Sequence, residues 1–87
     1  MATFHLSDQL QFAVDLALSG GWDEPHCIVQ QYNTAMACWI HAVLHKIEGD
    51  AWNSRYWYAR TRFVEYENFS SPQDELREIA RRLSQET

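Results

Sequence analysis

The sequence predicts an all-α protein, a compact bundle of about four helices with a central antiparallel helical hairpin. Three observations favour this class. Apolar residues recur every three or four positions along most of the chain, glycine and proline stand between these stretches, and no run of alternating apolar and polar residues is long enough for a strand. The 87 residues fit one domain, 1–87, since a second domain would need roughly 100 residues more.

The first helix is expected over 8–19. Ser7 can cap its N-terminus, and Gly20-Gly21 follows its end as a stop signal. The apolar stripe between these points is formed by Leu10, Ala13, Leu16 and Ala17.

A long second helix is expected over 25–48. Asp23-Glu24-Pro25 supplies a capping acid, a carboxylate that suits the helix dipole and a proline suited to the first turn. Two apolar stripes run along this helix, so we expect it to be buried over a wide arc with other helices on both sides. A turn at Asn33-Thr34 could interrupt this helix.

The sharpest structural signal is Glu48-Gly49-Asp50, a helix stop with a left-handed glycine followed by a new N-cap. Because this turn is so short, the next helix, expected over 51–62, must pack antiparallel to the one before it. Its stripe, with steps of four, three and four, consists of Trp52, Tyr56, Ala59 and Phe63. We expect Tyr56 to face inward, and Arg55 and Arg62 to face outward.

The last helix is expected over 72–85. Ser71-Pro72 supplies its cap and its first-turn proline. Its narrow apolar stripe consists of Leu76, Ile79, Ala80 and Leu83. The preceding stretch, 65–71, is polar without a helical period and is expected to be a loop.

The charge balance argues against nucleic acid as a partner. Twelve acidic residues against seven basic ones give a formal charge of −5, which repels polyphosphate. The stretch 55–62 interleaves arginine with aromatic residues, a mixture found in single-strand binders. On a helix these side chains fan around the axis, which is more typical of ordinary packing.

Membrane insertion and disulfide formation are not expected either. The longest apolar run, 35–40, is far shorter than the roughly 20 residues that span a bilayer. Cys27 and Cys38 would lie about 16 Å apart on one helix, too far to form a disulfide. Two unpaired cysteines and an N-terminus without a secretory leader pattern predict a cytoplasmic protein.

Histidines in the expected long helix are the main candidates for chemistry. His41 and His45 are four positions apart, so both imidazoles project from one face at a spacing that suits two ligands of one metal ion. Glu48 lies one turn further on, and His41, His45 and Glu48 are the candidate ligands of a divalent metal, the one cofactor that the sequence suggests. A further ligand must come from elsewhere; the candidates are His5, His26 and Asp50.

Two other interpretations of these residues remain open. In a structural role, buried histidines and Glu48 form a polar network that fixes the helix turn, while Asp50 caps the next helix. In an acid–base role, a histidine exchanges a proton near neutral pH beside a desolvated Glu48.

Residues 39–58 follow the pattern Trp-x-His-x-x-x-His-x-x-Glu-Gly-Asp-x-x-Asn-x-x-Tyr-Trp-Tyr, with His26-Cys27-Ile28-Val29-Gln30 upstream. Together these segments resemble a family of small uncharacterised bacterial and fungal helical proteins. The family pattern often continues with Arg-Arg, where this chain has Ala59-Arg60. The resemblance implies no catalytic residue, but it implies one recurring polar and aromatic set: His26, His41, His45, Glu48, Asp50, Asn53 and Trp57.

A weaker resemblance is to one unit of a tetratricopeptide repeat, with Gly49-Asp50 at its inter-helix turn. Ala42, Ser54 and Thr61 would then stand at small-residue positions. Arrays of this kind need about three units for stability, so the likeness is one of helix hairpins in general.

The leading functional prediction is a small helical interaction module that self-associates. A bundle of this size cannot cover all of its four tryptophans and four tyrosines, and exposed aromatic faces mark interfaces. The expected partner is a second copy, giving a homodimer, or another protein. The alternative is a small metal-assisted or acid–base enzyme that uses His41, His45 and Glu48; an enzyme is the less expected of the two.

Overall fold

The computed structural model describes residues 5–85, which form five α-helices, one short 3₁₀ helix and no strand. In chain order the elements are α1 (Leu6–Leu18), α2 (Asp23–Val29), α3 (Ala35–Ile47), α4 (Ala51–Thr61), η1 (Tyr66–Asn68) and α5 (Pro72–Ser84). The all-α class is confirmed, with one helix more than expected. The expectation that the N-terminus has no secretory leader pattern concerns residues 1–4, which lie outside the described residues.

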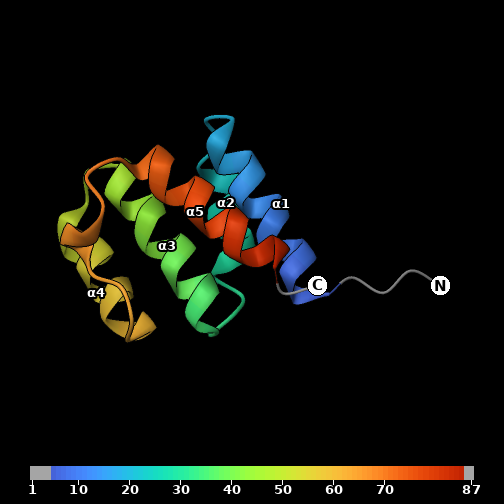
Figure 1. Ribbon diagram of the computed structural model, residues 1–87. Helices are drawn as coiled ribbons and strands as arrows, with labels where there is room; N and C mark the ends of the chain where they lie inside the picture. The colour runs from blue at the N-terminus through green and yellow to red at the C-terminus, as the bar shows by residue number, and fades with distance from the viewer. Residues whose placement is uncertain (1–4, 86–87) are drawn as a thin grey trace.

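Helix α3 is the central element of the bundle. It packs against α1, α2, α4 and α5, while α1 and α5 also pack against each other (Figure 1). All residues from Ala37 to His45 are buried. This agrees with the expectation of burial on a wide arc. Helix α4 lies at the edge of the bundle, where it packs against α3 and η1 (Figure 1).

The expected single helix over 25–48 is wrong, because the structure divides it into α2 and α3. Helix α2 ends at Val29, and α3 begins at Ala35 with Thr34 as its N-cap. The Thr34 hydroxyl accepts a hydrogen bond from the Ala37 N–H at 3.2 Å, which satisfies one of the N–H groups that a new helix start leaves free. The break lets α2 fold back onto α3.

The two cysteines consequently lie on different helices. Cys27 is exposed on α2 and Cys38 is buried on α3, and both are free. The two residues therefore do not share one helix, contrary to the expectation, although both thiols are unpaired in the described structure.

The other helix boundaries lie within two residues of those expected. Ser7 lies inside α1 and not at its N-cap, which is His5 without a side-chain cap bond. Gly49 has φ +84°, the left-handed conformation expected at the turn between α3 and α4. The loop expected over 65–71 contains η1.

The inward face of α4 differs from the one expected. Tyr56 is 49% exposed, whereas the buried face consists of Ser54, Tyr58 and Thr61. The Ser54 hydroxyl donates to the Ala42 carbonyl at 2.7 Å, which brings α4 close to α3. Polar side chains can occupy a buried face when their hydrogen bonds are satisfied, and these bonds outweigh the apolar periodicity.

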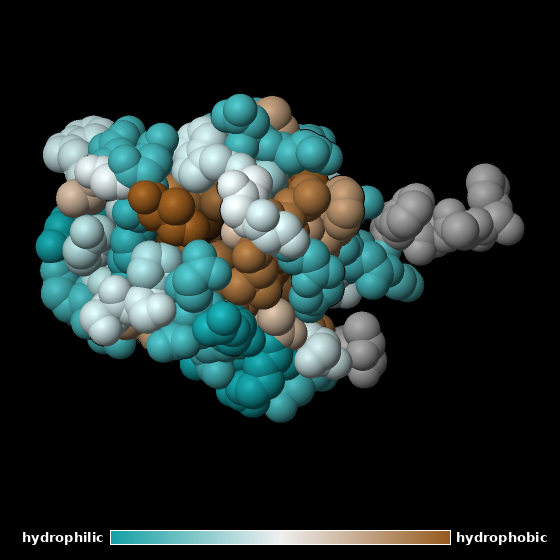
Figure 2. Space-filling view, turned by 90° about the horizontal axis from the view of Figure 1, so that it is seen from above, coloured by the Kyte–Doolittle hydropathy of each residue, from teal (hydrophilic) through white to brown (hydrophobic). Residues whose placement is uncertain are grey.

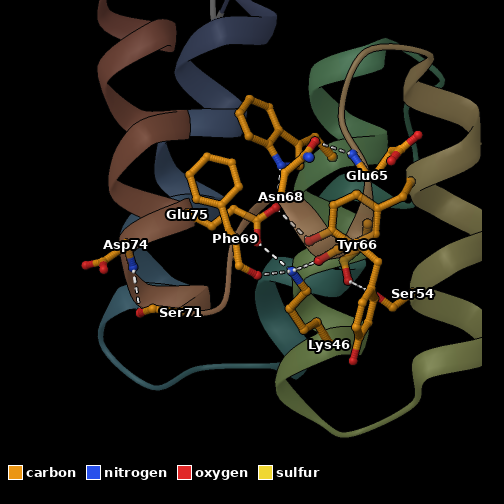
Figure 3. Close-up of polar contacts among 12 residues, drawn as sticks. Lys46, Ser54, Glu65, Tyr66, Asn68, Phe69, Ser71, Asp74 and Glu75 are labelled. Carbon is orange, nitrogen blue, oxygen red and sulfur yellow. Dashed lines mark hydrogen bonds and ion pairs between the residues drawn. The ribbon is translucent and has the colours of Figure 1, made fainter.

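A fully buried carboxylate, Glu75, joins three helices (Figure 3). It accepts hydrogen bonds from Trp39 Nε1 at 2.7 Å and from the Tyr58 hydroxyl at 2.6 Å. Lys46 Nζ donates to Glu75 Oε1 at 2.9 Å, and also to the carbonyls of Tyr66 and Phe69 at 2.9 and 3.1 Å. Burial, and next the hydrogen bond to Glu75, raises the pKa of Tyr58, so its phenol stays protonated.

The surface seen from above is mostly hydrophilic, with hydrophobic side chains gathered toward its middle (Figure 2). Among the described helices, none has the length and apolar character needed to cross a bilayer.

The buried ion pair generates a first prediction. Glu75→Gln and Lys46→Met should each lower the free energy of unfolding by about 3 kcal/mol, because each leaves the other charged group buried without its partner. The double variant should lose at least about 1 kcal/mol less than the sum of the two, because it leaves no buried charge unpaired. Urea unfolding followed by circular dichroism measures all three.

The exposed ion pair between Arg55 and Glu67, whose side chains are 55% and 59% exposed, provides the control. Replacing Glu67 by Gln should change stability by no more than about 1 kcal/mol. Additive losses at Glu75 and Lys46 would show that the two charges do not depend on each other.

Candidate functional site

Three histidines meet between α2 and α3. His41 and His45 lie on one face of α3, 4% and 8% exposed, with ring centroids 5.0 Å apart. His26, on α2, lies 4.7 Å from the His41 ring and 5.4 Å from the His45 ring. We call His26, His41 and His45 the histidine cluster.

The break between α2 and α3 creates this cluster. On one continuous helix, His26 and His41 would be separated by about 22 Å at 1.5 Å per residue. The sequence named His26 as one possible further ligand, yet no local signal placed it beside the other two. The chain reversal after α2 supplies the missing placement.

Two tryptophans border the cluster. Trp57 of α4 stacks on His41 with ring centroids 3.9 Å apart and planes 12° from parallel. Trp22 stacks on His26 at 4.6 Å and 14°, and its indole N–H donates to the Leu44 carbonyl at 2.6 Å. Trp57 belongs to the set that the sequence singled out, whereas Trp22 was missed. Its position just before an expected helix start gave no indication of this contact.

The remaining residues of the predicted set lie at the turn between α3 and α4. Glu48 Oε1 lies 2.6 Å from His45 Nδ1. Asp50 caps α4 by accepting a hydrogen bond from the Asn53 N–H at 3.2 Å, and its other oxygen accepts one from Asn53 Nδ2 at 2.5 Å. These bonds lower the pKa of Asp50. The turn therefore has the capping arrangement expected for Asp50, with Asn53 as the bonding partner.

Burial favours the uncharged forms of His26 and His41. Desolvation, followed by repulsion from His26 and His45, lowers the pKa of His41 to about 3. Desolvation and His45 also lower the pKa of His26, against smaller opposing effects of Glu48 and Asp23. Neutral imidazoles retain a lone pair on one ring nitrogen, so they can accept a proton or bind a metal ion.

Two groups of three residues have ligand atoms within 4.8 Å of one another in the described part of the chain. The first is the histidine cluster, and the second consists of His45, Glu48 and Asp50. The expected trio of His41, His45 and Glu48 is neither of them. Of the further ligands considered, His26 and Asp50 each join a group, whereas His5 is exposed at the start of α1 and joins neither.

A second candidate surface is the outward side of α4. Trp52 is 77% exposed and stacks with Tyr56 at a centroid separation of 6.5 Å. The Arg60 guanidinium lies 5.9 Å from the centroid of the Tyr56 ring. We call Trp52, Tyr56 and Arg60 the α4 aromatic face.

The depressed pKa of His41 generates a second prediction. Between pH 6.5 and about 3, His41 binds fewer protons in the folded protein than in the unfolded chain, so its contribution to stability falls as the pH falls through this range. The contribution is at most about 1.4 kcal/mol for each pH unit below 6.5. We expect His41→Phe, which keeps a ring against Trp57, to flatten the pH dependence of urea unfolding measured with a chelator present.

His26 and His45 face His41 across the cluster, and Trp57 covers its other side, so no carboxylate among the described residues stacks against this ring. The matched control is His5→Phe, since His5 is exposed and outside the cluster. Superimposable pH profiles for the original protein and His41→Phe would contradict the prediction.

No family model, curated protein or solved structure was found to match this chain. The resemblance carried by residues 26–58 therefore stays a prediction.

Proposed function

We propose that this protein is a small helical interaction module that self-associates into a homodimer through the α4 aromatic face. The observation that carries this proposal is the exposure of Trp52, at 77%, beside a stacked and half-exposed Tyr56. Tryptophan, tyrosine and arginine are the residues most enriched among those that dominate binding energy at protein interfaces. The α4 aromatic face carries one of each.

The position of α4 supports the same proposal. Helix α4 packs against α3 and η1 at the edge of the bundle, and its outward side is the one left for a partner (Figure 1). We propose that α3 and α4 form the expected antiparallel hairpin, since Ala42 contacts Ser54 and His41 contacts Trp57. Such a hairpin presents the α4 aromatic face on a rigid element.

A second candidate function, acid–base or metal-assisted catalysis, is favoured by the short contact between His45 and Glu48. The Glu48 side chain is 37% exposed, so this pair reaches solvent. An imidazole held by a carboxylate can exchange protons with a bound molecule.

A cytoplasmic location remains our proposal and is supported by the free thiols of Cys27 and Cys38.

Self-association gives a third prediction. At micromolar concentration the sedimentation mass should approach twice the monomer mass of 10.3 kDa. Trp52→Ser combined with Tyr56→Ser should weaken the dimer by about 30-fold or more, because truncating a central interface residue costs about 2 kcal/mol. The double variant should therefore sediment as a monomer with unchanged helical content.

Phe12→Ser is the matched control, since Phe12 on α1 is 51% exposed but lies outside the α4 aromatic face. A monomeric original protein would reject the proposal. If Phe12→Ser abolished the dimer to the same extent, the loss would not be specific to the α4 aromatic face, and the proposed interface would be wrong.

A further inference from the structure

The histidine cluster contains ring nitrogens that make no hydrogen bond within the described protein. His45 Nδ1 is engaged with Glu48, but neither the His26 nor the His41 imidazole makes a hydrogen bond within residues 5–85. His41 is nevertheless only 4% exposed. These ring nitrogens have no partner within the protein, so they are free to bind a ligand that comes from outside the chain.

The unpartnered nitrogens remain accessible to a small ion. Every fully buried side-chain nitrogen or oxygen in the described chain has a hydrogen-bond partner. The two ring nitrogens of His41 have none, so each of them keeps some contact with solvent. His26 is only partly buried and forms the outer side of the cluster. A path to the three rings therefore exists without opening the core.

We propose that His26, His41 and His45 together bind one zinc ion. Zinc bound by imidazoles has Zn–N distances of about 2.0–2.1 Å, which in a tetrahedral site places neighbouring nitrogens about 3.4 Å apart. The ligand atoms of the three histidines already lie within 4.8 Å of one another, so small rotations of the side chains bring them to this spacing. Three protein ligands leave the fourth position to water or to an external molecule.

The donor type selects the class of metal. Imidazole nitrogen suits zinc and its transition-metal neighbours, whereas magnesium and calcium prefer sets of oxygen ligands. The three rings come from two helices. Trp22 stacks on His26, Trp57 stacks on His41, and Trp22 also makes an edge contact with His45. Ligands whose orientation is already fixed by packing lose less conformational entropy when the ion binds.

The second group of donors is a poorer site. Both carboxylate oxygens of Asp50 accept hydrogen bonds from Asn53 as part of the α4 cap, and binding a metal there would weaken that cap. Glu48 is likewise engaged with His45. Exposed acidic groups also remain well solvated without an ion.

Glu48 is a positioning residue in this proposal. Metal-binding histidines commonly donate their second ring N–H to a carboxylate, which fixes the tautomer and the ring orientation. The 2.6 Å contact between His45 Nδ1 and Glu48 Oε1 is such an arrangement, and it leaves Nε2 of His45 for the ion. The expected ligand set is thereby revised: His26 replaces Glu48, and Glu48 moves to the outer shell of the site.

The experiment is a titration of chelator-treated full-length protein with Zn²⁺ by isothermal calorimetry, against a competing chelator of known affinity. We expect one equivalent per chain and a zinc-dependent rise in Tm. His26→Ala should lower the affinity by about 100-fold or more, whereas Glu48→Gln should lower it by about 10- to 100-fold. His5→Ala, the matched control, should bind like the original protein.

Nitrogen-15 NMR of the histidine rings tests the ligand set in the unaltered protein, even if a variant fails to fold. Zinc should shift the resonances of His26, His41 and His45 and leave those of His5 unchanged. Absence of binding by the original protein, unchanged affinity in His26→Ala, or equal shifts at His5 would each overturn the proposal. Zinc binding can be measured on the monomer or on the dimer. Its outcome therefore tests the zinc site separately from the proposed dimer interface on the α4 aromatic face.

Discussion

The buried carboxylate of Glu75 is the constraint on which the packing of the second half of the chain depends. A charge removed from water costs several kcal/mol unless it is paired and hydrogen-bonded. Lys46, Trp39 and Tyr58 satisfy it together, and they come from α3 and α4. We infer that few other registers of α5 against these helices would satisfy all of these groups. The same contacts hold α3 in the centre of the bundle.

Helix α3 carries a polar cluster on each of two sides. Trp39 and Lys46, seven positions apart, point toward Glu75, whereas His41 and His45 point toward α2. The first cluster is closed, since every member has its partner within the protein. The second keeps free nitrogens, and this difference separates a structural network from a candidate binding site.

Local signals predicted most of the helices, because caps, glycines and prolines act over a few residues. The turn at Gly49, the cap at Asp50 and the start of α5 were therefore correctly placed. The break before α3 was considered only as a possible turn at Asn33-Thr34, since Thr34 is also compatible with a helix interior and neither glycine nor proline marks the break. The place of His26 depends on that break, so the sequence supplied the ligand types but not their meeting point. The role of Glu75 could not be predicted from local sequence either, because its partners lie 17 to 36 positions away along the chain.

The short length of α2 divides the molecule into parts of unequal local stability. A helix of seven residues does not persist alone in water, so α2 depends on its docking against α1 and α3. Its detachment would release His26 while the Glu75 network still held α3, α4 and α5 together. Such a sub-global opening would show as faster amide hydrogen exchange confined to residues 23–29. A ligand that joins His26 to α3 would close this segment, which makes the exchange rate of α2 a direct gauge of occupancy at the histidine cluster.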